Sequence, residues 1–155
     1  MKKIILISLT ALAVIACQQK KSGNEQSELW QQNIVGEWFY ESVSGDSVSN
    51  RYQIFLQLKA SGQVIEREHY ILPAQGGKPA VDRDGNIFTG TWKIQNDTLV
   101  KKGVMKVISE EGLYSKEEPE RKEGEVTGYT KVVNVTKDSI ITLDRAGSTV
   151  VFVRH

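Results

Sequence analysis

Apolar and polar residues alternate along most of the chain with the period of two that is typical of β-strands. The clearest case is 51–59, where Tyr52, Ile54, Leu56 and Leu58 share one side. Segments of this kind recur between turn residues. We predict eight strands, at 35–43, 51–59, 63–71, 86–94, 98–108, 125–135, 138–144 and 148–154. Between them, 72–85 and 109–124 are predicted to be long loops, and 27–34, with Ser27 as its cap, a short turn of helix.

Most of these strands are joined by short connections, which force neighbouring strands to be antiparallel. Eight antiparallel strands can remove their exposed edges by closing on themselves. The fold class that we predict is therefore all-β, an eight-stranded antiparallel up-and-down β-barrel. A two-sheet sandwich is the competing architecture.

The N-terminus has a different pattern, with a positive head at 1–3 followed by the apolar run 4–16. This run is shorter than the roughly twenty residues that cross a bilayer. Its length and its flanks indicate a secretory signal peptide over 1–16. The polar segment 18–28 contains no apolar residue, so we expect it to be a flexible tether that reaches roughly 20 Å.

The sequence Val14-Ile15-Ala16-Cys17 resembles the lipobox of bacterial lipoproteins. The resemblance implies cleavage between Ala16 and Cys17 and three acyl chains, palmitate among them, on Cys17. Acyl chains in this number anchor a protein stably without spanning the membrane. Because Gln18 stands where a retention signal would place aspartate, the resemblance favours the outer membrane of a Gram-negative bacterium. An ordinary signal peptide followed by an incidental buried cysteine is the alternative.

Composition narrows the functional classes. The formal net charge is +1, so there is no concentrated basic face to suggest a nucleic-acid partner. The chain has a single cysteine, which excludes an intramolecular disulfide.

The segment beginning at Gly36-Glu37-Trp38 resembles the Gly-x-Trp signature of lipocalins. In that family the tryptophan plugs the closed end of the barrel, and a basic residue of the last strand stacks on it. Arg154 is the matching residue here, and 90–94 resembles the middle of small lipocalin-like (calycin-type) domains on bacterial lipoproteins. The resemblance covers nearly all of 29–155 and implies a lipocalin-like barrel domain there. The Thr-Asp-Tyr motif of true lipocalins is missing.

Strand alternation then selects the side chains that would face the barrel axis with Trp38. They are aromatic and aliphatic with a few polar tips, which is typical of a small-molecule site. The candidate ligand-lining residues are Tyr40, Tyr52, Ile54, Leu56, Leu58, Phe88, Trp92 and Phe152. The same side chains could instead meet and fill the barrel, and the sequence leaves both alternatives open.

Catalytic and metal-binding patterns are weak. Glu66, Glu68 and His69 lie close together, but alternation separates the histidine from the glutamates, and we interpret the group as a solvated strand face. The sequence 82–86 departs from the calcium-loop spacing and is interpreted as an Asp-Gly turn. We therefore expect no enzyme, no metal and no cofactor.

Two functional hypotheses follow, and a hydrolase is a distant third. In the first, a membrane-tethered lipoprotein binds a small hydrophobic ligand in the barrel mouth, with 72–85 and 109–124 as lids. In the second, the barrel is a scaffold, and the same two loops contact a protein partner in envelope assembly.

Overall fold

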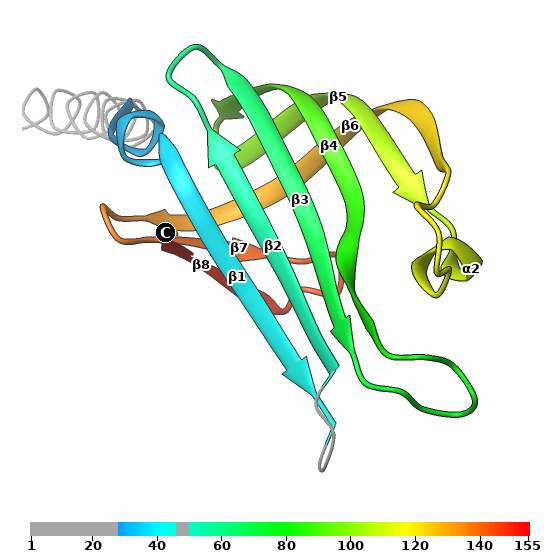
Figure 1. Cartoon of the computed structure of the whole chain (residues 1–155). Coiled ribbons are helices and arrows are strands. Elements are labelled where there is room, and N and C mark those ends of the chain that lie inside the picture. Colours follow the sequence, from blue (N-terminus) through cyan, green and yellow to red (C-terminus); the bar gives the residue numbers. More distant parts are fainter. Residues whose placement is uncertain (1–27, 46–49) are drawn as a thin grey trace, which may run out of the picture.

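Eight antiparallel strands close into a single barrel in the order β1 to β8, which confirms the predicted fold class (Figure 1). The structure is a computed structural model, and it describes residues 28–45 and 50–155. The predicted signal peptide, Cys17, most of the tether and Ser27 lie outside the described residues. The strands are β1 (Gly36–Ser44), β2 (Asn50–Leu58), β3 (Gln63–Leu72), β4 (Val81–Gln95), β5 (Thr98–Ile108), β6 (Arg121–Val135), β7 (Ser139–Leu143) and β8 (Thr149–Arg154).

Two strands begin earlier than the sequence predicted. β4 starts at Val81, so 82–86 belongs to a strand, and the prediction of an Asp-Gly turn there is wrong. β6 starts at Arg121, inside the segment predicted as a long loop, and that segment also contains the short helix α2 (Glu110–Leu113). Both strand beginnings are rich in polar residues because they extend beyond the packed core, where their side chains meet water.

Tight turns between consecutive strands set the register. The β2–β3 turn includes Gly62 at φ 80°, and the β4–β5 turn places Asn96 at φ 56°. These left-handed conformations favour glycine and asparagine, and they match the twist of the flanking strands. The turns fix Leu58 opposite Val64 and Ile94 opposite Leu99, so apolar side chains from all four strands face the same interior.

One end of the barrel, which we call the closed end, is filled by the core. Residues 28–33 form a helix that covers this end and buries Trp30, and the following Ile34 is 0% exposed. Trp30 of this helix is a core residue that the predicted strands did not include. The core consists of Trp30, Ile34, Trp38, Leu56, Leu58, Val64, Phe88, Trp92, Ile94, Leu99, Val132, Val135, Ile140 and Phe152.

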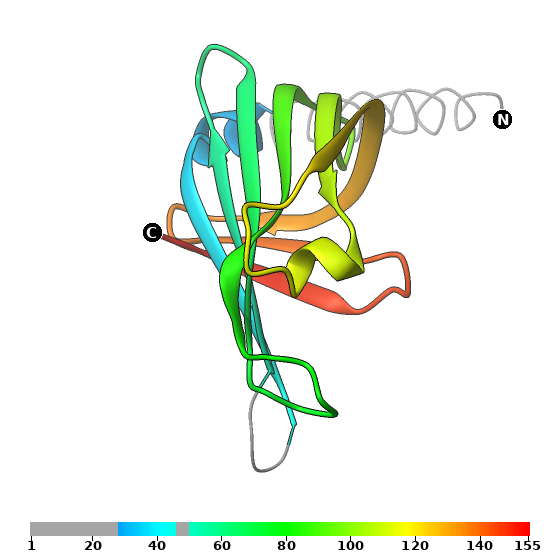
Figure 2. The same cartoon turned by 45° about the vertical axis from the view of Figure 1, so that its right-hand side comes forward.

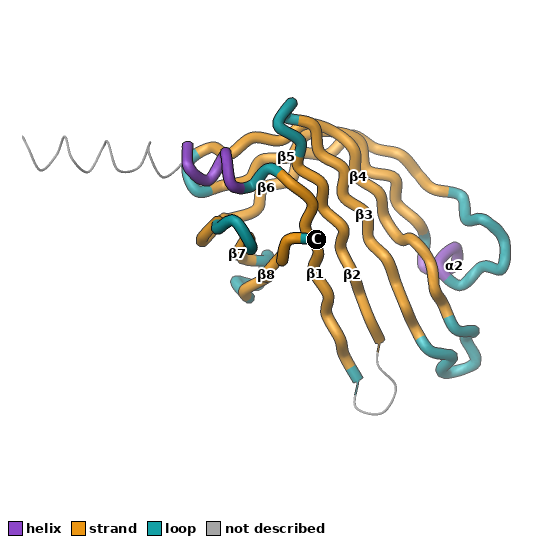
Figure 3. The backbone as a smooth tube through the Cα atoms, turned by 60° about the vertical axis from the view of Figure 1, so that its left-hand side comes forward, coloured by secondary structure: helices purple, strands orange, loops and turns teal. Residues whose placement is uncertain are grey.

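The opposite end, which we call the open end, lies beside the 73–80 connection and α2. Strands β1–β4 extend toward it well beyond the short strands β7 and β8 (Figure 3). β7 has 5 residues and β8 has 6, whereas β4 and β6 have 15 each. β1 pairs with β8 only at Trp38 and Phe39, so the remainder of β1 has no strand on that side. The barrel wall is therefore complete at the closed end and interrupted at the open end.

Candidate functional site

Trp38 lies at the centre of the closed end, where it is 1% exposed. Its indole N–H donates a 2.8 Å hydrogen bond to the carbonyl of Ile34, which satisfies the one polar atom of the buried ring. The guanidinium of Arg154 lies over the ring, 4.3 Å from its centroid, in the geometry of a cation–π contact. The aromatic ring and the cation, from the first and last strands, thus close this end together.

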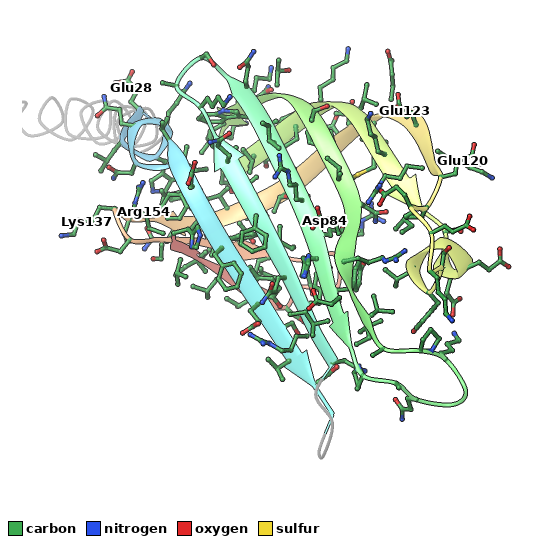
Figure 4. All side chains as sticks on the ribbon, in the orientation of Figure 1. Glu28, Asp84, Glu120, Glu123, Lys137 and Arg154 are labelled. Atoms are coloured by element: carbon green, nitrogen blue, oxygen red, sulfur yellow. The ribbon has the colours of Figure 1, made fainter. Side chains whose placement is uncertain are left out.

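Arg154 also binds the backbone of the segments around it. It donates hydrogen bonds to the carbonyls of Asn33 (3.0 Å), Val35 (3.3 Å) and Lys137. Figure 4 shows Arg154 beside Lys137 at this end of the molecule. Gly36 leaves room for the guanidinium, since a Cβ there would stand 2.3 Å from its Nη1 atom. The position of the Arg154 guanidinium against β1 therefore favours glycine at residue 36.

The candidate ligand-lining residues divide into two groups by exposure. The five that belong to the packed core are Leu56, Leu58, Phe88, Trp92 and Phe152, each no more than 8% exposed. The other three, Tyr40, Tyr52 and Ile54, are half-buried. Because they face inward yet meet solvent, water reaches the barrel interior from the open end.

Strand register brings three further residues to the same interior face. Glu66 pairs with Leu56, Glu68 with Ile54, and Tyr70 with Tyr52. Cross-strand partners share a face of the sheet, so both glutamates point into the barrel. The interpretation of these glutamates as a solvated face is wrong. The signal that could have located them is the short β2–β3 turn, which fixes the parity of β3 from that of β2.

Glu66 is paired inside the barrel with Lys101 of β5. The ammonium of Lys101 contacts the Glu66 carboxylate and lies 5.6 Å from the centroid of the Phe88 ring. The side chains are only 15% and 16% exposed, so this ion pair is largely removed from water. Burial of a charge requires such a partner, since an unpaired charge is costly in a medium of low polarity.

Glu68 lies one inward position nearer the open end and is surrounded by tyrosines. The Tyr70 hydroxyl donates a 3.1 Å hydrogen bond to it, and the Tyr52 and Tyr70 ring centroids are 5.1 Å apart. Burial and the negative charge of Glu68 raise the pKa of Tyr70 to about 12 and raise the pKa of Tyr52 further. Gly85 of β4 makes room for the Tyr70 ring, because a Cβ there would lie 2.3 Å from a ring carbon. Both tyrosine hydroxyls therefore remain protonated, and the negative charge of Glu68 disfavours a second negative charge beside it.

The rim of the open end includes α2 and the segment that follows it, which Figure 2 brings to the front of β4. Arg83 of β4 donates a 2.9 Å hydrogen bond to the carbonyl of Gly112. Lys78, in the β3–β4 connection, forms a 2.5 Å ion pair with Glu110 and lies 4.6 Å from the centroid of the Tyr114 ring. The two long connections are thus attached to each other and to the barrel.

His69 lies on the outer face, between two aspartates of β4. Its Nδ1 is 2.9 Å from Asp84 and its Nε2 is 3.0 Å from Asp82. Partial burial lowers the pKa of His69, but the hydrogen bonds and charges of both aspartates outweigh burial and raise the pKa above its usual value. No group of three residues suited to a metal ion occurs in the described ranges 28–45 and 50–155.

The outer face of β1–β3 carries a shallow groove of about 400 Å³. The ring centroids of Phe39 and Phe55 are 5.1 Å apart there, and that of His155 lies 5.9 Å from Phe55. Ile65 and Arg67 complete its floor. Trp38 and Leu56, whose side chains face the interior, also contribute to the lining of this groove.

The sequence matches no known protein-family model, and no curated protein is significantly similar to it. Among the described residues, no helix has the length and apolar character needed to cross a membrane.

Proposed function

We propose that this protein is a membrane-tethered lipoprotein with a lipocalin-like barrel, which binds a small, largely hydrophobic ligand at its open end without transforming it. The observation that carries the proposal is the change in exposure along the barrel axis. Inward side chains are fully buried around Trp38, whereas Tyr40, Tyr52 and Ile54 remain half-buried near the interrupted wall. Half-exposed aromatic and aliphatic side chains inside a barrel offer apolar contact that the protein itself does not satisfy.

The composition of this inner surface suits binding better than catalysis. Apolar contact comes from Ile54 and from the ring of Tyr40, which lies 5.7 Å from that of Phe152. Polar contact comes from a few tyrosine hydroxyls and two carboxylates. An apolar surface with few polar groups is the usual make-up of a site that orients a small molecule.

Two matched substitutions on β2 test where a ligand binds. Ile54 faces inward and its neighbour Phe55 faces outward, where it is 36% exposed. Using the mature chain with Cys17→Ser, we expect Ile54→Lys to weaken binding of the neutral fluorophore N-phenyl-1-naphthylamine by about tenfold or more, the cost of a charge at an apolar contact. Phe55→Lys should bind the fluorophore like the parent chain. Equal affinity of both variants, or no binding by the parent chain, would refute a ligand site in the barrel.

The anchor is a separate part of the proposal and has its own experiment. The lipobox-like Ala16-Cys17 junction supports lipid attachment at Cys17 and a place at the outer membrane of a Gram-negative host. Cells that express the chain and receive an alkynyl palmitate should incorporate the label, and the protein should fractionate with membranes. The Cys17→Ser variant should incorporate no label. Equal labelling of both chains would contradict the assignment.

A second candidate function is a protein-interaction or envelope-assembly module. The attachment of the two long connections through Lys78, Glu110 and Tyr114 favours it, because it makes them one surface. A photo-crosslinker at Gln75, in this surface, should capture one specific protein, and a crosslinker at Lys93, on the outer face of β4, should not. Absence of an adduct at Gln75 would remove this candidate.

A further inference from the structure

Two carboxylates face the barrel interior near the aromatic surface, and they differ in their partners. Glu66 and Glu68 both face inward from β3, and Arg83 of β4 shares this face through its pairing with Tyr70. Lys101 is bound to Glu66. Within 28–45 and 50–155, no lysine or arginine forms an ion pair with Glu68, whose partner is the neutral hydroxyl of Tyr70.

Two aromatic rings lie beside Glu68, and aromatic rings can attract an ammonium group. The faces of aromatic rings carry partial negative charge and attract cations, and a carboxylate adds a full charge. Tyr52 and Tyr70 lie 5.1 Å apart with their rings tilted by 44°. Gly85 allows the Tyr70 ring to lie directly against β4, so the position of this ring is fixed by the strand behind it.

A cation beside a carboxylate and an aromatic ring is already present at Glu66, the neighbouring inward position of β3. The Lys101 ammonium contacts the Glu66 carboxylate and lies over the Phe88 ring. The same combination of carboxylate and aromatic ring recurs at Glu68, where no lysine or arginine of the described chain forms an ion pair. Arg83 shares the inward face through its pairing with Tyr70, and its hydrogen bonds to the carbonyls of Gly112 and Glu117 direct its guanidinium toward α2 and the segment that follows α2.

We propose that the ligand carries a primary or quaternary ammonium group, which Glu68 and the Tyr52–Tyr70 pair receive, while its apolar part lies against Ile54 and Tyr40. This inference rests on the proposed function, since it assigns the chemical class of the ligand in the same barrel. The charge of the ligand's head group is then the property by which the site distinguishes one ligand from another.

The experiment compares three probes with one chain length and different head groups: dodecyltrimethylammonium, dodecanol and dodecyl sulfate. Each competes with N-phenyl-1-naphthylamine for the mature Cys17→Ser chain, below its micelle-forming concentration. We expect dodecyltrimethylammonium to bind at least about tenfold more tightly than dodecyl sulfate, which corresponds to about 1.4 kcal/mol. Glu68→Gln should abolish this preference, because it weakens the binding of dodecyltrimethylammonium by at least about tenfold relative to that of dodecanol. The matched control Glu125→Gln, on the outer side of β6, should keep the preference.

The outcomes separate the two proposals. Equal affinities of the three probes, or a preference that persists in Glu68→Gln, would overturn the ammonium assignment while leaving ligand binding in the barrel intact. Failure of the neutral fluorophore to bind the parent chain would overturn both. If Glu68→Gln does not fold, Tyr70→Leu replaces it. This variant keeps the carboxylate and removes one ring. It should lower the preference for dodecyltrimethylammonium over dodecyl sulfate by at least about threefold. An undiminished preference in Tyr70→Leu would likewise overturn the assignment.

Discussion

The ion pair inside the barrel allows the sharpest test of the interior. Replacing Lys101 by Met keeps a side chain of similar length and leaves the Glu66 carboxylate without its cation. Removing one partner of a fully buried pair costs about 3–5 kcal/mol. Because these side chains are 15% and 16% exposed, we expect a loss of about 2–3 kcal/mol in the free energy of unfolding. The double variant Glu66→Gln/Lys101→Met removes both charges and should recover most of this loss.

The measurement is a double-mutant cycle from urea unfolding, followed by tryptophan fluorescence at constant pH. The matched control is the pair Lys106–Glu123, which joins β5 and β6 at 2.7 Å with side chains 44% and 57% exposed. Its coupling energy should stay below about 1 kcal/mol, as for other exposed pairs. If the Lys101 and Glu66 substitutions prove additive, or if each costs as little as the control, these side chains are fully solvated and the assigned interior is wrong.

Two further predictions concern the closed end and the outer face. Gly36→Ala should lower the free energy of unfolding by about 1–2 kcal/mol, because its Cβ would displace the guanidinium of Arg154 and its hydrogen bonds. The control is Gly124→Ala, where a Cβ meets nothing within 4 Å. An equal loss of stability in both variants would contradict this explanation. His69 has a raised pKa in the folded state, so its stabilisation is complete below its ordinary pKa and is lost as the pH rises through the raised value. The stability advantage of the parent chain over His69→Gln should therefore be larger at about pH 5.5 than at about pH 9, and a constant difference in urea midpoint would refute this.

The strands that the sequence located well are those with one apolar face and one polar face. β2 is the clearest, since Leu56 and Leu58 are core residues and their neighbours Phe55 and Gln57 face outward. Burial of one face imposes the period of two, so the pattern is visible without coordinates. The contact between Arg154 and Trp38 was predicted only from the lipocalin resemblance. In the structure the guanidinium is stacked on the indole ring.

The sequence could not locate the polar part of the interior. In β3, Val64 and Ile65 are adjacent apolar residues, so alternation alone does not decide which side faces the axis. The choice follows from the turn that pairs Leu58 with Val64, and it turns Glu66 and Glu68 inward. Pairing of Glu66 with Lys101 compensates for its burial, and this contact joins residues far apart in the sequence. A hydrophobic pattern contains no information about such a compensation.

The unequal strand lengths have a consequence for the size of molecule that the barrel admits. At about 3.3 Å per residue, β4 would extend about 50 Å if it were straight, and β7 only about 17 Å. If a chain-like ligand is held at its head as we propose, its tail would lie along the part of β1 that has no pairing with β8. We therefore expect a barrel that binds such a ligand to discriminate among molecules by their heads and to tolerate tails of many lengths.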